Sequence, residues 1–295
     1  MSETLKRVLI ILSASILFGF YPPAARGAYA DGANSVFIIL LTTFIRGLSM
    51  AGLCLTSKQR LFANKKDAAI ALRSGFIQAL SIVGILWSLV YLPGPVTIIL
   101  LFTSTVMLLF FMWFKGEVEV NTWLFVTTAA CLVGLTFVVD LWHTKTSNEV
   151  IGYALAMLGA GATASRLYIF GKLTKSKPPM VVGAETFLCA FLFLLFLPLY
   201  QAPILPHSMA GWGWAILCAG TSGLGSVAMF YGIAKVGPFY FSLYNKMEPV
   251  FAAIFSALLI GEILKTEQYV GMAIVIASLV TYQVWDHRRK YLADL

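Results

Sequence analysis

Ten apolar runs, each close to the length that crosses a bilayer, constrain the fold of this chain more than any other feature. An α-helix needs roughly 20 apolar residues to span about 30 Å of hydrocarbon. The runs are continuous rather than alternating, and open sheet edges find no hydrogen-bond partners in lipid. They lie near residues 8–28, 35–56, 68–91, 95–114, 121–141, 149–171, 180–200, 211–235, 238–260 and 267–286. The sequence therefore predicts an all-α integral membrane protein with ten transmembrane helices.

The composition supports this class and argues against nucleic acid as a partner. Of the 295 residues, 59% are hydrophobic and only 12% are charged, whereas soluble domains carry roughly 25% charged residues. The net charge is +8, which is expected of a membrane protein because Lys and Arg accumulate in cytoplasmic loops. The four cysteines lie far apart inside apolar runs, so neither a disulfide framework nor a metal site is indicated.

The loop charges predict the orientation of the chain. If the N-terminus is cytoplasmic, the far side has only Arg26, Lys145 and Lys265. The cytoplasmic side then collects Lys6, Arg7, Lys58, Arg60, Lys65, Lys66, Lys115, Lys172, Lys175, Lys177, Lys235, Arg288, Arg289 and Lys290. This asymmetry predicts that both termini are cytoplasmic. The apolar stretch Val8–Phe18 is followed by Pro22-Pro23 and Arg26, where a cleaved leader would have small residues, so we expect it to be retained in the first helix.

The two halves of the chain resemble each other at an offset of 145 residues. The matching positions are Pro93 and Pro238, Gly116-Glu117 and Gly261-Glu262, Gly75 and Gly220, and Phe110 and Phe255. Each half has five runs, and an odd number inverts the second half in the membrane. We therefore expect two inverted five-helix repeats, residues 1–146 and 147–295. Inverted repeats are typical of secondary transporters, although a gene duplication without a transport role would leave the same pattern.

The ninth run carries polar residues at its centre: Asn245, Lys246 and Glu248, followed by Pro249. Ionisable groups at this depth are costly and normally face a bundle interior or a cavity. Pro249 donates no backbone hydrogen bond and clashes with the carbonyl one turn earlier, so it weakens the helix near Asn245. Three interpretations of the charges remain open. Lys246 and Glu248 bind the two ends of a zwitterion, Glu248 couples transport to a proton, or Glu248 forms a structural ion pair with Arg46.

Other runs contribute further candidates. Pro22 and Pro23 break or kink the first helix beside Tyr21, and we expect them, like Pro249, to act as hinges. Gln78 either lines a cavity or bonds a neighbouring helix, and Trp87 is either a cavity residue or part of an interfacial belt. Arg166, in the sixth run, either extends to the headgroups, which is common near a helix end, or binds a carboxylate through two hydrogen bonds. The predicted substrate-binding residues are Tyr21, Gln78, Trp87, Thr103, Tyr231, Tyr244, Asn245 and Glu248.

An apolar run with Glu248-Pro249 at its middle and Gly261-Glu262 at its end resembles the second half of the drug/metabolite transporter superfamily, in its EamA-like branch. The resemblance implies a basket-like bundle whose central cavity opens alternately to either side. It also implies amino acids or other small metabolites as substrates, often exported, as in the YddG-type amino-acid exporters. Pro22-Pro23 stands where a Trp-containing turn is usual, and Thr103-Ser104 stands where Pro is common.

We therefore expect a secondary transporter of a bacterial inner membrane that exports amino acids or related metabolites. One alternative is an uptake carrier for an organic cation, held by Tyr21, Trp87 and Tyr231 around Glu248. Another is a membrane protein that transports nothing.

No enzyme, metal or cofactor is indicated by the sequence. The histidines His143, His207 and His287 have no neighbours at ligand or triad spacing, and there is no phosphate-binding glycine loop. The expected partners are a small-molecule substrate and the lipid bilayer, and we expect a monomer, with a homodimer as the alternative.

Overall fold

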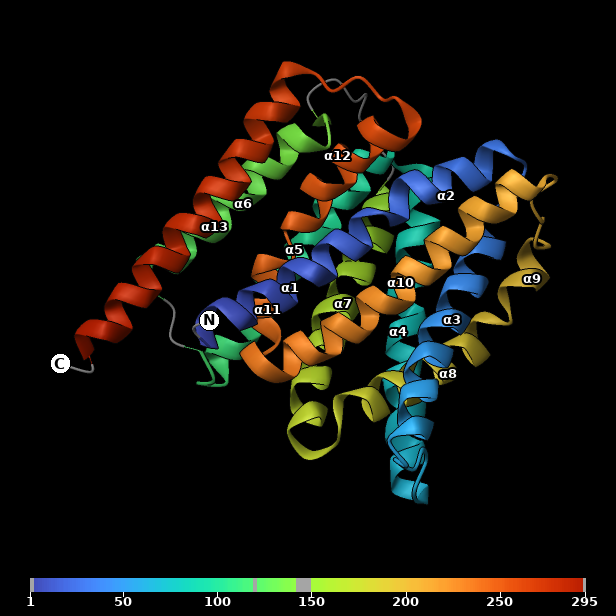
Figure 1. Ribbon diagram of the computed structural model, residues 1–295, viewed down its shortest axis with the longest axis horizontal. Helices are drawn as coiled ribbons and strands as arrows, with labels where there is room; N and C mark the ends of the chain where they lie inside the picture. Colours follow the sequence, from blue (N-terminus) through green and yellow to red (C-terminus); the bar gives the residue numbers. More distant parts are fainter. Residues whose placement is uncertain (1–2, 119–120, 142–149, 294–295) are drawn as a thin grey trace.

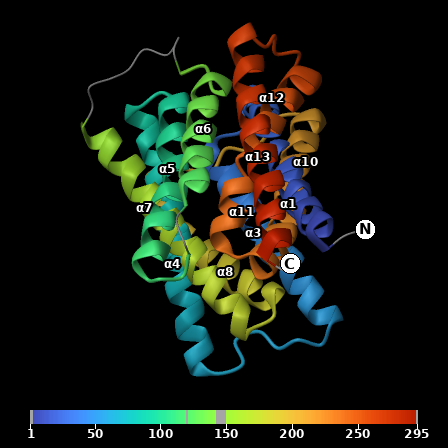
Figure 2. The same ribbon diagram turned by 90° about the vertical axis from the view of Figure 1, so that its left-hand side faces the viewer.

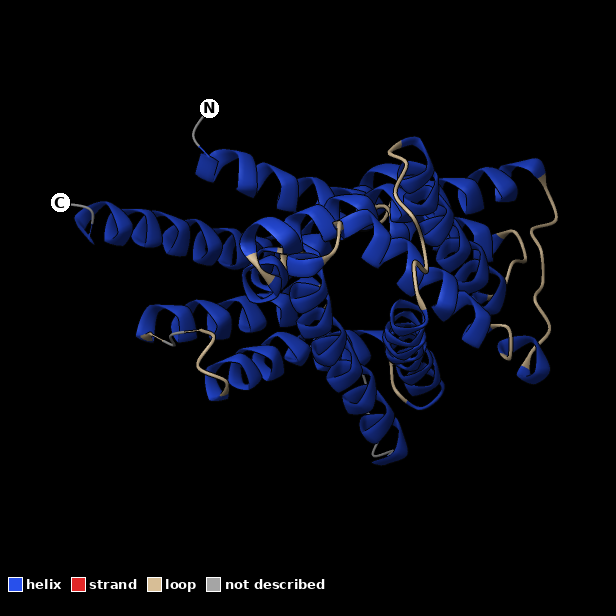
Figure 3. Ribbon diagram, turned by 90° about the horizontal axis from the view of Figure 1, so that it is seen from below, coloured by secondary structure: helices blue, strands red, loops and turns tan. Residues whose placement is uncertain are grey.

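The computed structural model describes residues 3–118, 121–141 and 150–293. These residues form helices joined by short loops, without a strand among them (Figure 3). The helices are α1 (Glu3–Gly19), α2 (Tyr21–Ala30), α3 (Ser35–Thr56), α4 (Lys65–Tyr91), α5 (Gly94–Phe114), α6 (Thr122–Val138), α7 (Val150–Ser176), α8 (Pro179–Leu194), α9 (Leu197–Tyr200), α10 (Met209–Val236), α11 (Pro238–Tyr244), α12 (Met247–Ile260) and α13 (Thr266–Ala293).

The predicted membrane class is confirmed by the length and composition of these helices. Within the described residues, nine helical segments are long and apolar enough to cross a membrane, and the shorter apolar helix α6 makes a tenth candidate. The predicted boundary between the two halves, residues 146 and 147, lies outside the described residues, as does His143.

Two of the spans are interrupted beside prolines. The first span divides into α1 and α2 at Phe20, and Pro22 and Pro23 lie in the first turn of α2. A proline is tolerated there because the first turn of a helix has no intrahelical partner for its N–H groups. The ninth span divides into α11 and α12 at Asn245 and Lys246, one turn before Pro249. The carbonyl of Asn245 accepts instead from the amide of Glu248 at 2.9 Å.

The seventh span is interrupted as well, which the continuous apolar run at 180–200 did not indicate. Helix α8 ends at Leu194 and the short helix α9 begins at Leu197, with Pro198 in its first turn. Pro198 interrupts its helix as the other prolines do. Its neighbours are apolar, so the hydropathy along the chain shows no break at this position.

The helices pack in pairs that join distant parts of the chain. Helix α4 lies against α7 and α8, α10 lies against α1 and α3, and α6 runs beside α13 (Figures 1 and 2). The α4–α7 pair meets at glycines: a Cβ atom at Gly84 would lie 2.9 Å from the backbone nitrogen of Gly159. Small residues allow such a close approach, which is a common way for helices to pack in membranes.

Both ends of the chain lie at the same end of the bundle. Figure 1 shows the start of α1 and the end of α13 on the same side of the bundle, with the turn between α12 and α13 at the opposite end. The end of α6 lies beside that turn. The bundle therefore has a terminal end and an opposite end, and the functional site is described relative to these two.

Candidate functional site

A cavity of about 790 Å³ lies between the helices and extends from the middle of the bundle to the end opposite the termini. Its mouth is lined by Arg26 in the second half of α2, and by Asp140, Glu262 and Lys265 in the loops at that side. On the terminal side, Phe241 lines the cavity and belongs to the main buried hydrophobic cluster. The cavity is therefore accessible from one end and closed by apolar packing at the other.

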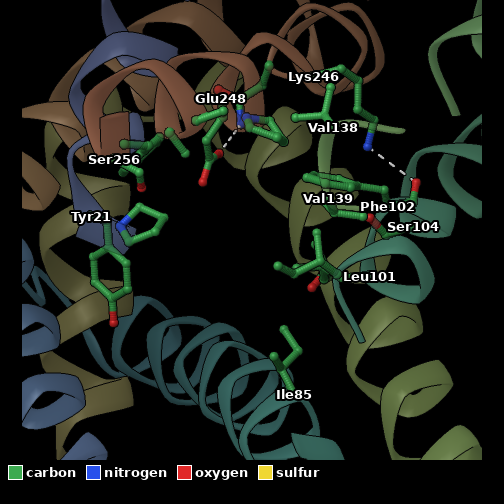
Figure 4. Close-up of a pocket in the computed structure, with 18 of the residues that line it drawn as sticks. Tyr21, Ile85, Leu101, Phe102, Ser104, Val138, Val139, Lys246, Glu248 and Ser256 are labelled. Carbon is green, nitrogen blue, oxygen red and sulfur yellow. Dashed lines mark hydrogen bonds between the residues drawn. The ribbon is translucent and has the colours of Figure 1, made fainter. Parts of the chain in front are cut away.

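The interruption between α11 and α12 places Glu248 in this cavity. Figure 4 shows the Glu248 side chain directed into the open space, with Tyr21 on the same side. The side-chain amide of Asn245 donates to Glu248 Oε2 at 2.7 Å, and the Ser15 hydroxyl donates to Asn245 Oδ1 at 3.1 Å. Glu248 is also in the first turn of α12, where unpaired backbone N–H groups favour a carboxylate. The α11–α12 break and α1 thus jointly position this carboxylate.

Lys246 lines the same cavity, but its ammonium group is already engaged. It donates to the carbonyl oxygen of Phe102 at 3.2 Å and lies 4.1 Å from the centroid of the Phe102 ring. The residue is only 3% exposed, and the side chain is directed away from Glu248 (Figure 4). Lys246 therefore joins the α11–α12 break to α5, and its contacts do not favour the interpretation in which it binds the substrate directly.

Arg46, near the middle of α3, lines the cavity and lies among aromatic rings. Its guanidinium carbon lies 5.6 Å from the ring centroid of Phe18, 5.8 Å from that of Tyr21 and 5.7 Å from that of Phe187. Among the ion pairs of the described residues, none involves Arg46, and its Nε atom is buried without a hydrogen-bond partner. The sequence-based ion pair between Arg46 and Glu248 is therefore not formed, because the carboxylate turns to Asn245 and aromatic rings surround the guanidinium.

A second guanidinium faces the cavity from α7. Arg166 Nη1 donates to Gln78 Oε1 at 2.9 Å, Gln78 is 2% exposed, and both residues line the cavity. The Arg166 Nε atom is buried without a partner. Gln78 thus lies at the cavity and bonds a neighbouring helix at the same time, so its two interpretations are compatible.

Of the two interpretations of Arg166, the one in which it reaches the headgroups is wrong. Helix α7 continues to Ser176, five residues past the predicted end of the run. Ten residues then separate Arg166 from the helix end, or about 15 Å at a rise of about 1.5 Å per residue. That distance is too long for the side chain, so Arg166 belongs among the cavity residues. The sequence indicated this location only by two polar residues, Gln78 and Arg166, in the interiors of two apolar runs.

Two aromatic residues that the sequence placed at the site lie elsewhere. Trp87 is 38% exposed and contacts the ring of Tyr200 at a centroid distance of 6.1 Å. Tyr231 is 46% exposed on α10. Neither lines the cavity, because each projects from the outer face of its helix.

Two polar candidates are also directed away from the cavity. The Thr103 hydroxyl donates to the carbonyl of Leu100 at 2.6 Å, and its neighbour Ser104 lines the cavity instead. The Tyr244 hydroxyl donates to the side-chain carbonyl of Gln283, so it links α11 to α13. Of the predicted substrate-binding residues, the structure brings together Tyr21, Gln78, Asn245 and Glu248.

Two ion pairs border the mouth of the cavity. Arg26 Nη1 lies 2.7 Å from Glu262 Oε2, and Lys265 Nζ lies 2.6 Å from Asp140 Oδ2. The first pair joins α2 to the end of α12, and the second joins the end of α6 to the start of α13. Within the described part of the chain, no group of three or more His, Cys, Asp or Glu side chains is placed to hold a metal ion.

Fold and cavity together define a multi-pass helical membrane protein with a charged cavity between its helices. Residues 150–282 match the model of the EamA-like transporter family. This match to the second half supports the predicted resemblance to the drug/metabolite transporter superfamily. Members of the EamA-like family are membrane transporters rather than enzymes.

A solved structure shares this fold. A crystal structure described only as that of a protein superposes with a TM-score of 0.81 at 14% sequence identity, covering 96% of this chain and 98% of the other. At that identity the likeness concerns the fold alone. The search of curated proteins found no match to this chain.

Proposed function

We propose that the protein is a secondary transporter that exports amino acids or related small metabolites across a bacterial inner membrane by alternating access. The observation that carries this proposal is the cavity, which places Arg46, Arg166 and Glu248 in the middle of the spans, where no ion pair between described residues involves any of them. Ionisable groups within a membrane are costly, and they mark pathways for substrates or ions.

The two halves, residues 1–146 and 147–295, are proposed to be inverted repeats. The packing supports this, because contacts recur when the halves are exchanged. Helix α4 packs on α7 as α10 packs on α1, and α5 packs on α7 as α12 packs on α1. The pairs α3–α8 and α6–α13 each join a helix to its counterpart in the other half. In secondary transporters of this design, the substrate site lies near the midplane between the repeats.

We also propose that both termini are cytoplasmic. In the described loops and helix ends, the terminal end carries Lys58, Arg60, Lys65, Lys66, Lys115, Lys172, Lys175, Lys177 and Lys235, while the opposite end carries Arg26 and Lys265. Basic residues accumulate on the cytoplasmic side, so the cavity in this structure opens outward. Alternating access then requires the mouth to close and the apolar packing at the terminal end to part, with the breaks at Pro22, Pro23 and Pro249 as hinges.

The alternative function, uptake of an organic cation, finds less support in the cavity. Trp87 and Tyr231 lie outside it, and the remaining aromatic of that set, Tyr21, lies against the Arg46 guanidinium. A cation would meet like charge there, which opposes binding.

Counterflow in proteoliposomes tests the proposed function. Purified protein is reconstituted, loaded with a mixed pool of amino acids and small organic acids, and given one labelled compound at a time. Accumulation above that in empty liposomes is the expected result. Accumulation of choline-like cations alone would favour the alternative carrier, and no accumulation of any compound would favour a protein that does not transport.

A further inference from the structure

We infer that the substrate is an organic anion whose carboxylate or phosphate group binds the Arg46 guanidinium, with Arg166 beside it in the same cavity. This inference rests on the proposed transport function and narrows its substrate class. It predicts acidic amino acids and organic acids in preference to neutral amino acids.

The first reason is the balance of charge in the cavity. Its lining includes the carboxylates of Asp140, Glu248 and Glu262. The two at the mouth are bound to Lys265 and Arg26, which leaves Glu248 alone, among the described lining residues, to face three inner cations.

Those inner cations are Arg46, Arg166 and Lys246. They come from three different parts of the fold, α3, α7 and the α11–α12 break, and converge on one space. Charge attraction and repulsion are strong where water is scarce, so an excess of positive charge there is costly unless an anion compensates for it. A neutral zwitterion leaves the excess unchanged, whereas a substrate with net negative charge reduces it.

The second reason is that the two guanidinium groups retain donors that no protein group uses. A guanidinium has five N–H donors and binds carboxylate or phosphate through two parallel hydrogen bonds. Arg166 gives one bond to Gln78, and Arg46 has no hydrogen-bond acceptor among the described residues. Buried polar groups are nearly always hydrogen-bonded, and both Nε atoms are exceptions. The rings around Arg46 stabilise its charge, but they offer no oxygen acceptor for its N–H donors, which an anion would supply.

The third reason is the apolar wall across the cavity, which favours an anion with a carbon skeleton. Ile82, Ile85, Ile98 and Leu101 line the cavity, and Figure 4 shows Ile85 and Leu101 on the opposite side of the open space from Tyr21 and Glu248. Glu248 repels a second carboxylate but accepts a hydrogen bond from an ammonium or hydroxyl group, which an acidic amino acid supplies.

A matched series of compounds tests the charge requirement directly. Glutamate and glutamine have nearly the same shape but differ by one negative charge. Succinate, succinamate and succinamide have charges of −2, −1 and 0, and glycerol 3-phosphate tests phosphate. Binding to the purified protein is measured by the rise in unfolding temperature, because a ligand that binds only the folded state stabilises it. We expect glutamate, succinate or glycerol 3-phosphate to raise the unfolding temperature, and the uncharged analogues to have little effect.

Variants separate a binding role of Arg46 from a structural one. Arg46→Gln should weaken binding of the anion by roughly tenfold or more, because it removes a hydrogen-bonded charge. Arg46→Lys should be intermediate, since an ammonium keeps the charge without the two parallel donors. Without ligand, Arg46→Gln should be at least as stable as the wild type, because an unpaired cation is lost. The control is Arg73→Gln, which removes an exposed guanidinium of α4 outside the cavity and should leave binding unchanged.

The outcomes distinguish this inference from the proposed function. Binding or counterflow of neutral amino acids with no response to any of the anions would overturn the inference and leave the transporter intact. Binding of anions without flux through reconstituted protein would support the inference and overturn transport. No response to any anion, or anion binding that Arg46→Gln leaves unchanged, overturns the inference.

Discussion

Replacement of Gln78 by alanine isolates the contribution of one hydrogen bond to substrate binding. Gln78 is 2% exposed and accepts from the Arg166 guanidinium at 2.9 Å. A hydrogen bond to a charged group contributes about 1.5–3 kcal/mol. If Gln78 positions Arg166 for the substrate, the whole of that energy is lost from binding, and about 1.4 kcal/mol corresponds to a tenfold change. The apparent KM should therefore rise by roughly 10- to 150-fold, with the maximal rate retained.

The assay is the initial rate of counterflow in proteoliposomes, measured over a range of substrate concentrations. The matched control is Ser74→Ala on the same helix, which removes a buried hydrogen bond of 2.9 Å to Thr186 outside the cavity. The control should lose about 1 kcal/mol of stability and keep its KM. An unchanged KM in well-folded Gln78→Ala, or an equal rise in the control, would refute the role assigned to Gln78.

Four other substitutions test the cavity, its surroundings and its mouth. Glu248→Gln keeps a hydrogen-bonding partner for Asn245 but removes the charge, so the protein should fold normally while its flux falls by about tenfold or more; wild-type flux in folded protein would contradict a role for this carboxylate in substrate or proton binding. Trp87→Phe and Tyr231→Phe alter exposed residues, so flux should change by less than about twofold, and a larger loss would place these rings on the transport pathway. Lys265→Gln breaks an exposed pair with Asp140, worth about 0–1 kcal/mol, so stability should hardly change. Asp140 then lacks the neighbouring Lys265 ammonium, so its charge should repel an anionic substrate and raise its KM by about two- to fivefold at low salt, an effect that should fade at high salt. An identical KM at low salt would show that the charge at the mouth is irrelevant.

Several features of the fold depend on local properties of the sequence, namely the length of apolar runs and the positions of prolines. Apolar length predicts the spans because each helix satisfies its own backbone hydrogen bonds in lipid. The break before Pro249 is predictable for the same local reason, since proline removes one of those bonds and clashes with the preceding turn. A proline, Pro198, also marks the division between α8 and α9. Unlike Pro249, it has no polar neighbours, so the sequence analysis did not predict a break there.

The candidate site was predictable only in part. Glu248 and Asn245 were apparent as polar residues in an apolar run, and the structure places both in the cavity. Trp87 and Tyr231 looked equally suitable because tyrosine and tryptophan occur both at binding sites and at membrane interfaces. Nothing in their own neighbourhood along the chain distinguishes these two locations.

The sequence by itself determined the membrane class, the helical spans and the interruption at Asn245, because these depend on local hydrophobicity and on single backbone hydrogen bonds. Only the tertiary structure decided which face of each helix lines the cavity. In a soluble protein the apolar stripe marks the inner face, but lipid is as apolar as the protein core. Hydrophobicity therefore does not show that Arg46 is surrounded by Phe18, Tyr21 and Phe187, or that Arg166 meets Gln78. Those contacts depend on how α3, α4 and α7 pack against their neighbours.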